Sequence, residues 1–419
     1  MVDPAAPTGR TSPAATATRL PGGLELRTAR PADLDQIGTL LVERGDEADG
    51  LDHRLVVHDP DLGWDASAVV VDGDRVAATA TLLDETVRLG DVTLPAGQVE
   101  LVAVHPDYEH RGLARALMGW AHRRSADRGH LVQLIIGIPY FYRRFGYEYA
   151  IDIPPARRLV GSVPEVGAAA GALRDARSED LPGLVGLQEA TQAAFDVAVP
   201  HPAARWRALL AQSASRTRVL ERDGAVVASA RVRADDDGLV AAEPAAVDAG
   251  AANALLARLA AQLPDGQELS VVHRAGTVTG DTWDRLLDVP DAGCEQYYLR
   301  IPDVGALLGA LRPVLWRRAC ALAPQVLGEA LVISTFGAHH RLPVTADGFG
   351  PVQTGGPMQS PGVHGGFGVA PDQLGALLFG QRGFAGLRRV RPDVYGRPAV
   401  GEALFPAVTA DLLTYYLPW

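Results

Sequence analysis

The chain has 419 residues, with 39 basic and 50 acidic side chains and a formal net charge of −11, which argues against general affinity for nucleic acid and favours cationic partners. Its basic side chains are all arginine, because the sequence contains no lysine. This excludes a P-loop NTPase, a Schiff-base enzyme and a protein kinase, each of which needs a lysine ammonium. Codon usage in a GC-rich genome is the simplest explanation for the missing lysine. The length corresponds to roughly three domains of about 150 residues.

Cysteine content and hydropathy indicate a cytoplasmic protein. Cys294 and Cys320 form neither a disulfide framework nor a zinc site. No apolar run reaches the about 18 residues of a membrane-spanning helix. Residues 1–22 lack the apolar core of a signal peptide, and we expect them to be a disordered tail.

Hydrophobic periodicity over residues 24–145 predicts alternating strands and helices. The expected strands are 24–27, 68–71, 76–83, 98–104 and 131–136, and the expected helices are 31–44, 113–124 and 140–145. Asp72-Gly73-Asp74 is a strong hairpin signal between two of these strands.

The chain then partly repeats itself. The segment Leu26–Leu34 returns as Leu173–Leu181, and the turn that begins at Asp72 returns at Asp223. The offsets of 147 and 151 residues agree within the variation of loop lengths. We therefore expect two copies of one α/β module, although two chance turns would give the same pattern.

The residue pattern of the sequence changes after Arg300. Helices are expected at 303–311, 314–320 and 371–378, a strand at 330–335, and a Gly- and Pro-rich loop at 354–368. Residues 403–419 are apolar to the last residue, which is unusual because chain ends are normally polar and frayed.

The segment 102–115 is the first motif that carries chemistry. A strand runs into a tight turn, and a helix opens at Gly112 or Leu113. Glycine allows a ligand to approach the backbone closely, and the N–H groups at a helix start favour phosphate. Arg111 and Arg115 add cationic donors suited to a pyrophosphate. The same sequence pattern also fits an ordinary strand-to-helix turn with surface arginines and no bound ligand.

A second segment, 137–147, places Phe-Tyr-Arg-Arg-Phe-Gly-Tyr after a buried strand. Together the two segments resemble the GNAT superfamily of acyl-CoA N-acyltransferases, strongly over about 24–155. The length and plan are similar to acetyltransferases of the enhanced-intracellular-survival (Eis) type. The resemblance implies an α/β (α+β) fold: a catalytic GNAT domain at 23–157, a degenerate GNAT-like domain at 158–298, and a sterol-carrier-protein-like domain at 299–419.

The resemblance also implies site residues. Tyr142 matches the tyrosine that the family uses as general acid, and the carboxylate of Trp419 matches its terminal general base. The cofactor-binding positions are Val102, Ala103 and Val104 for pantetheine, His110, Arg111, Gly112, Leu113, Ala114 and Arg115 for pyrophosphate, and Gly137 and Ile138 on the donor side. Acetyl-CoA is the implied co-substrate, no metal is expected, and the family suggests hexamers.

For several of these candidate site residues, a purely structural role is the alternative to a functional one. Tyr142 could be a buried aromatic and Trp419 an apolar plug, while Glu100 either attracts an amine or is solvated. Glu109 stands where the family's turn has Arg or Gln, so its carboxylate should repel a pyrophosphate. Gly137-Ile138 replaces the family's Ser-Glu stretch, so donor-side contacts there would be backbone only.

Other sites find little support in the sequence. The equivalent turn of the second module, 248–253, lacks arginine beside glycine, so we expect no cofactor there. His105, His110 and the pair His339-His340 match no metal spacing. The Gly355-Gly356 stretch lacks a phosphate-binding lysine.

The sequence therefore predicts an acetyl-CoA-dependent N-acetyltransferase that acts on a primary amine of a cationic small molecule, aminoglycoside-like or a polyamine. The alternatives are a non-catalytic acyl-CoA-binding sensor, a biosynthetic acyltransferase that uses another acyl-CoA, and a lipid carrier acting through residues 300–419.

Overall fold

The computed structural model describes residues 17–234, 238–264, 266–290 and 295–412. The chain divides into two compact units: residues up to Leu82 together with Glu100–Arg123, and Leu83–Val99 together with the chain from Arg124 onward. It passes between the units within β4 (Arg75–Leu89), β5 (Val92–Val104) and α3 (Leu113–Asp127). Each unit is described by itself.

The first unit is built on antiparallel strands in the order β1-β2-β3-β4. Its other elements are β1 (Thr18–Arg19), β2 (Glu25–Thr28), β3 (Ser67–Asp72), α1 (Leu34–Arg44) and α2 (Glu47–His58). The β3–β4 hairpin turns at Gly73, whose φ of 59° favours glycine, as the Asp-Gly-Asp signal predicts. Helix α1 buries Ile37, Leu40 and Leu41, an i, i+3, i+4 stripe that explains why this segment is helical.

The second unit contains three groups of strands. In the first, the ends of β4 and β5 lie beside β6 (Val132–Ile135), β15 (Gln296–Arg300) and β7 (Glu148–Asp152), in the order β4-β5-β6-β15-β7. A further strand, β10 (Val197–Ala198), pairs with β4 on one side and with β22 (Ala410–Asp411) on the other. The second sheet has the order β8-β14-β13-β12-β11-β9, and the third has the order β18-β17-β16-β20-β21, with β19 on β17.

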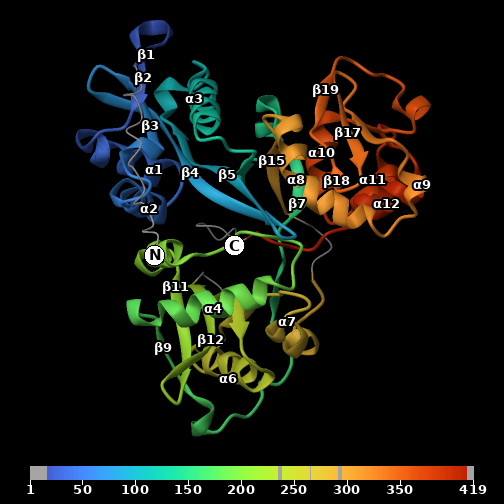
Figure 1. Ribbon diagram of the computed structural model, residues 1–419. Helices are drawn as coiled ribbons and strands as arrows, with labels where there is room; N and C mark the ends of the chain where they lie inside the picture. The colour runs from blue at the N-terminus through green and yellow to red at the C-terminus, as the bar shows by residue number, and fades with distance from the viewer. Residues whose placement is uncertain (1–16, 235–237, 265, 291–294, 413–419) are drawn as a thin grey trace, which may run out of the picture. The chain divides into compact units, whose positions relative to one another are not determined.

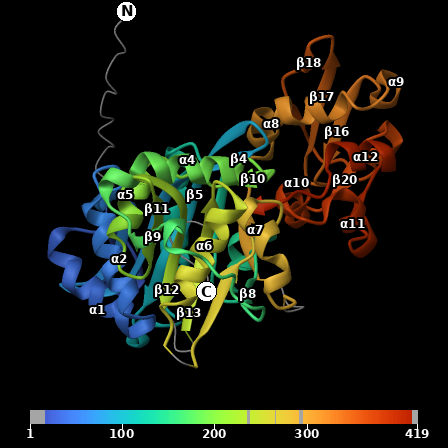
Figure 2. The ribbon, with the colours of Figure 1, turned by 90° about the horizontal axis from the view of Figure 1, so that it is seen from below.

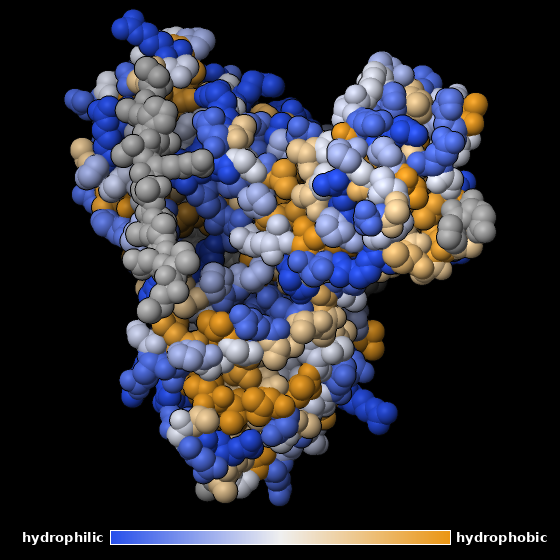
Figure 3. Space-filling model, in the orientation of Figure 1, coloured by the Kyte–Doolittle hydropathy of each residue, from blue (hydrophilic) through white to orange (hydrophobic). Residues whose placement is uncertain are grey.

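The second sheet is formed by β8 (Ala156–Arg158), β9 (Ala172–Asp175), β11 (Arg216–Arg222), β12 (Ala225–Ala234), β13 (Gly238–Ala246) and β14 (Glu268–Val272). Its helices are α4 (Leu181–Gln192), α5 (Ala203–Ala211), α6 (Ala249–Ala260) and α7 (Val278–Trp283). The α6 residues Leu255, Leu256 and Leu259 are fully buried in one apolar core with Ala230 and Val232 of β12. Figure 3 shows hydrophobic residues gathered in the region of α4 and α6, consistent with the Ala- and Leu-rich composition of α6.

The third sheet comprises β16 (Ala330–Ser334), β17 (His339–Thr345), β18 (Gly348–Phe349), β19 (Gln353–Gly355), β20 (Phe367–Val369) and β21 (Val394–Tyr395). Helices α8 (Val304–Ala319), α9 (Pro324–Leu327), α10 (Leu374–Phe379), α11 (Gly383–Val390) and α12 (Pro398–Leu404) gather around these strands in both Figure 1 and Figure 2. Phe367 packs edge-on against Phe384 and Phe405, and all three rings are fully buried. These aromatic contacts hold the helices on the sheet.

The internal repeat is confirmed by an identical ion pair in both copies. Arg27 Nη1 lies 2.7 Å from Asp33 Oδ2, and Arg174 Nη1 lies 2.7 Å from Asp180 Oδ2. Each aspartate also accepts a 2.7 Å hydrogen bond from a backbone N–H three residues earlier, at Arg30 and Arg177 respectively. The two modules thus start their first helix with the same strand-to-helix junction.

A second shared feature lies in the strand that follows each hairpin. The parallel register of β5 with β6 joins Ala96–Gln98 to Val132–Leu134, and that of β13 with β14 joins Gly238–Ala241 to Glu268–Val271. A few residues further on, Leu101 and Glu243 have φ values of 53° and 49°, which side chains with a Cβ seldom adopt. Both strands therefore take an unusual backbone conformation shortly after the end of this parallel pairing.

The structure corrects several expected elements. The two helices predicted at 303–311 and 314–320 form the single helix α8, which contains Pro313 in its interior. Helix α2 was not anticipated, and the predicted helix at 140–145 is a 3₁₀ helix over Phe141–Phe145. The residues Gln296–Arg300, which the sequence suggests as a module boundary, form β15 and pair with both β6 and β7.

Among the residues described by the structure, no helix is long and apolar enough to cross a membrane.

Candidate functional site

The predicted pyrophosphate turn lies in the first unit, between β5 and α3. Val102 and Val104 are half-buried, whereas Ala103 between them is buried, as expected where alternate residues of a strand face opposite ways. His110 and Gly112 both have positive φ, at 62° and 79°, so the turn folds tightly just before the helix.

The same turn presents cationic groups at the start of a helix. Helix α3 begins at Leu113, with Ala116 N–H bonded to Gly112 O at 3.1 Å. The N–H groups of the first helical turn have no acceptor within a helix, so this end attracts anions. His110, Arg111 and Arg115 are exposed around it, and Ala114 is half-buried.

Glu109 does not carry an isolated charge into this turn. Its carboxylate forms a 2.8 Å ion pair with Arg44 of α1. The Arg111 guanidinium stacks over the Tyr108 ring at 4.9 Å, and the Tyr108 hydroxyl donates to Asp72 at 2.9 Å. The objection that Glu109 repels a pyrophosphate is therefore weakened, because Arg44 offsets its charge.

Tyr142 lies in the second unit and is held against the end of β6. Its side chain is buried, and its ring contacts Tyr147 and Tyr298 at centroid distances of 6.4 and 5.8 Å. A Cβ added at Gly137 would lie 3.1 Å from Tyr142 Cε2 and 3.5 Å from its hydroxyl. Gly137 also has a φ of 149°, so only glycine fits this position without strain. The structure brings these two predicted residues together.

Tyr298 and Tyr149 are site residues that sequence reasoning missed. Their rings stack at 4.0 Å, and the Tyr298 hydroxyl donates to that of Tyr149 at 2.6 Å. The Tyr298 hydroxyl also accepts a 2.6 Å hydrogen bond from the backbone N–H of Tyr140. It therefore anchors the segment that leads to Tyr142 from a strand more than 150 residues away in sequence. The Tyr-Tyr pair at 297–298 was the only signal that could have suggested it.

The phenols around Tyr142 stay protonated at neutral pH. Burial raises the pKa of Tyr298, and the hydrogen bond with Tyr149 raises it further. Burial also raises the pKa of Tyr147, whose hydroxyl donates to Gln133 Oε1 at 3.0 Å. Arg300 Nη1 donates to the same oxygen at 3.0 Å. Tyr142 thus stands among neutral hydroxyl groups with defined partners.

A cavity of about 400 Å³ opens beside the end of β6. Its lining is mostly apolar and aromatic with one carboxylate: Ile136, Gly137, Pro139, Tyr149, Ile153, Glu295 and Gln296. Ile138 is 63% exposed and does not line this cavity. The cavity suits a molecule with an apolar part and a cationic group near Glu295.

The chain is anchored just before its last residues. Asp411 accepts from Arg274 Nη2 at 2.6 Å and Nε at 3.0 Å, and from Gln192 Nε2 at 2.9 Å. Arg274 and Asp411 have fully buried side chains, and β22 pairs in parallel with β10. Trp419 lies outside the described residues, so the structure does not place the predicted base.

The predicted turn of the second module holds a different contact. Asp248 caps α6 by accepting a 2.7 Å hydrogen bond from Ala251 N–H, and it pairs with Arg222 at 3.2 Å. No group of three His, Cys, Asp or Glu side chains within the described residues could hold a metal ion.

Residues 26–150 match the family model of the acetyltransferase (GNAT) domain. The matched residues include the turn at 110–115 and Tyr142. The predicted fold class is confirmed: an α/β chain with sheets flanked by helices, similar over almost its whole length to solved GNAT structures.

Over 95 residues, the chain is 36% identical to the N-acetyltransferase Eis of Mycobacterium tuberculosis and of Mycobacterium bovis. This match covers 21% of the chain and 24% of those relatives, so the chain spans about a quarter of the length of the curated proteins it matches.

Solved structures show the same fold at low identity. A GCN5-related N-acetyltransferase from Kribbella flavida superposes with a TM-score of 0.66 at 22% identity, covering 97% of this chain and all of that one. Eis1 from Mycobacterium abscessus gives 0.60 at 19% identity, covering 94% and 99%.

Proposed function

We propose that the chain is an acetyl-CoA-dependent N-acetyltransferase that acylates a primary amine of a cationic small molecule. The observation that carries the proposal is Tyr142, a buried tyrosine with its hydroxyl against Gly137 inside a GNAT-type domain. The similarity to N-acetyltransferases named Eis supports the reaction class.

In this proposal, different residues bind different parts of acetyl-CoA. The backbone of Val102, Ala103 and Val104 binds the pantetheine arm, and the turn from His110 to Arg115 binds the pyrophosphate. Gly137 and Ile138 offer backbone groups on the donor side. Arg111, steadied by Tyr108, supplies positive charge for the phosphates.

Tyr142 donates its phenolic proton to the departing thiolate. A phenol and a thiol differ little enough in acidity for this transfer, and general acid catalysis of this kind contributes about 10²- to 10⁴-fold. The attacking amine must lose a proton, which we assign to the carboxylate of Trp419. Such a carboxylate is a weak base in water, so it acts by holding the ammonium and relaying the proton through water.

The acceptor is a cationic amine, aminoglycoside-like or a polyamine. The net charge of −11 and Glu295 in the cavity beside Gly137 favour such a molecule. We further propose a cytoplasmic protein with the predicted three-domain division, a sterol-carrier-protein-like third domain and a hexameric assembly, as the resemblance to the Eis type implies.

Two changes test the mechanism. Tyr142→Phe should lower kcat by about 10²-fold or more with little change in acetyl-CoA affinity, because only the proton donor is lost. Extension of the chain by a few residues beyond Trp419 should also slow turnover, because it removes the carboxylate from its place. The measurement is thiol release from acetyl-CoA with an amine panel.

The same assay decides between this function and its alternatives. If neither change slows turnover, the mechanism is wrong. Saturable acetyl-CoA binding without turnover on any amine indicates an acyl-CoA sensor, and turnover only with longer acyl-CoA donors indicates a specialised acyltransferase.

A further inference from the structure

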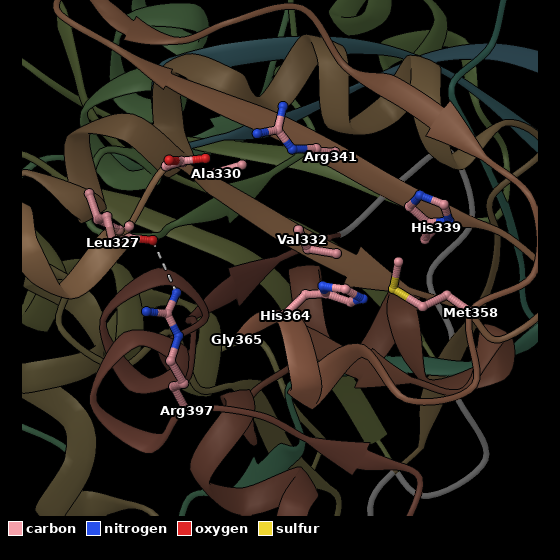
Figure 4. Close-up of a pocket in the computed structure, with 11 residues that line it drawn as sticks. Leu327, Ala330, Val332, His339, Arg341, Met358, His364, Gly365 and Arg397 are labelled. Carbon is pink, nitrogen blue, oxygen red and sulfur yellow. Dashed lines mark hydrogen bonds between the residues drawn. The ribbon is translucent and has the colours of Figure 1, made fainter.

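A second cavity, of about 410 Å³, lies in the part of the chain that holds the third sheet. Its walls come from four separate segments: α9 with β16, strand β17, the loop before β20, and the residue before α12 (Figure 4). The lining residues are Leu327, Gly328, Glu329, Ala330, Val332, His339, Arg341, Met358, His364, Gly365 and Arg397. None belongs to the acetyltransferase site.

The cavity concentrates cations that have no ionic partner. Arg341 and Arg397 both line it, and neither has a carboxylate within 4.0 Å in the part of the chain that the structure describes. Arg341 makes one long hydrogen bond, 3.4 Å, to Gln353 Oε1. The lining residues include these two arginines and one carboxylate, Glu329. An arginine beside a cavity is usually paired or binds an anion.

Arg397 is held in place although it lacks a carboxylate. Its guanidinium donates to the backbone carbonyls of Val326 and Leu327, as Figure 4 shows for Leu327. Gly365, with a φ of 64°, lies beside this side chain, and a Cβ there would be in ordinary contact with Arg397 Nε at 3.7 Å. That Nε is buried, and it has no hydrogen-bond partner among the described residues. A fixed guanidinium loses little entropy when it takes a ligand.

The opposite wall is equally fixed. His339 Nδ1 lies 2.8 Å from Gly356 O, and since a carbonyl only accepts, this nitrogen carries the hydrogen. Ser334 Oγ donates to Met358 O at 2.7 Å, and Met358 N–H donates to Phe336 O at 3.1 Å. Phe336 has a φ of 65°, a strained value that this hydrogen-bonded turn maintains.

We propose that this cavity binds a small organic anion. Its oxyanion head, a carboxylate or a phosphate, accepts hydrogen bonds from Arg341 and Arg397. A short apolar body lies along Leu327, Val332 and Met358. This binding is independent of the proposed acetyl transfer and needs no acyl donor.

The test uses the full chain without acetyl-CoA. Hexanoate, acetate and inorganic phosphate are titrated at constant ionic strength, and the thermal midpoint is followed, because a ligand that binds only the folded state raises it. Hexanoate or phosphate should raise the midpoint, and Arg341→Gln and Arg397→Gln should each weaken the apparent Kd about tenfold or more. Arg389→Gln, which alters an exposed arginine of α11, should leave it unchanged.

The pattern of stabilisation by the three anions identifies the class of ligand. Stabilisation by hexanoate above acetate identifies a carboxylate ligand, and stabilisation by phosphate alone identifies a phosphorylated one. Arg115→Gln separates phosphate bound at this cavity from phosphate bound at the pyrophosphate turn, because it should not affect the cavity. The proposal is overturned if no anion stabilises the chain at about 10 mM, or if Arg341→Gln binds as wild type does.

Discussion

Glu243 illustrates, at the scale of one residue, how a buried carboxylate is kept charged. Its oxygens lie 2.8 Å from His201 Nε2 and 2.9 Å from Arg231 Nη1, and all three side chains are fully buried. Burial alone would raise the pKa of Glu243, but the charges of His201 and Arg231 outweigh it and lower the pKa from 4.5 to about 2. Glu243 is therefore the counter-charge of a buried arginine.

Glu243→Gln should destabilise the fold by about 3–5 kcal/mol at pH 7, because Arg231 is left buried without its anion. The pKa of Glu243 is lower in the folded state, so its contribution is fully present above pH 4.5 and is lost as the pH falls toward 2. Urea unfolding at pH 7 and at pH 3 measures the difference. The control is the double variant Glu243→Gln with Arg231→Met, which should recover much of the lost free energy of unfolding. If it does not, packing rather than charge accounts for the destabilisation.

Gly137→Ala probes the placement of Tyr142 without touching its hydroxyl. The new Cβ would lie 3.1 Å from the Tyr142 ring, so kcat for thiol release should fall several-fold because the proton donor moves. Gly129→Ala is the matched control, since Gly129 also has a positive φ, 71°, but nothing lies within 4 Å of its Cβ position. It should cost about 1 kcal/mol of stability and leave kcat unchanged. Equal kcat in both variants would contradict the assigned role of Tyr142.

At the scale of elements, the two modules share the junction between the first strand and the first helix. The hydrogen bond from Arg174 lowers the pKa of Asp180, so this carboxylate is ionised at neutral pH and binds both Arg174 and the backbone N–H of Arg177. Such a junction satisfies a helix start that would otherwise leave N–H groups unpaired.

Asp180→Ala should therefore destabilise the second module by about 1–3 kcal/mol, because a charged hydrogen-bond acceptor and a helix start are lost together. Glu179→Ala, one residue earlier, removes only an exposed 3.4 Å pair with Arg177 and should change stability by less than about 0.5 kcal/mol. Chemical unfolding of the two variants compares them directly. If Glu179→Ala costs as much as Asp180→Ala, the junction is not the cause.

The repeat and most strands were predictable because their signals are local. The Asp-Gly turns, the alternating strands and the motif around Gly112 each lie within a few residues of sequence. Strand β15 was not predictable, since Tyr298 takes its place between β6 and β7 only through pairing with residues more than 140 positions earlier. The ion pair of Arg44 with Glu109 also joins distant segments, so the sequence alone left Glu109 unexplained.

At the scale of the whole molecule, Asp411 ties the last described strand to the second module. Its partner Arg274 also donates to Pro244 O at 3.1 Å and to Gln188 Oε1 at 3.3 Å, so it connects β13, α4 and β22. This pairing was not predictable from local patterns, because 137 residues separate the two charges.

Asp411→Asn should cost about 3–5 kcal/mol, because the buried Arg274 loses its anion. Unfolding in urea and cleavage by a protease near residue 410 should both become easier. The control is Glu402→Gln on the exposed side of α12, which should leave both measurements unchanged. Equal protease resistance in the two variants would mean that β22 is held by its backbone pairing with β10 alone.

The pairing of Arg274 with Asp411 also constrains how the protein is made. A ribosome that adds about 5–20 residues per second finishes Asp411 some 7–27 seconds after Arg274, because 137 residues lie between them. During that interval the nascent second module can form most of its sheet, but the buried Arg274 lacks the carboxylate of Asp411 and β10 has no β22 beside it. Premature termination before Asp411 therefore yields a chain that keeps this defect permanently, which makes it a substrate for chaperones and proteases rather than a competitor of the finished protein.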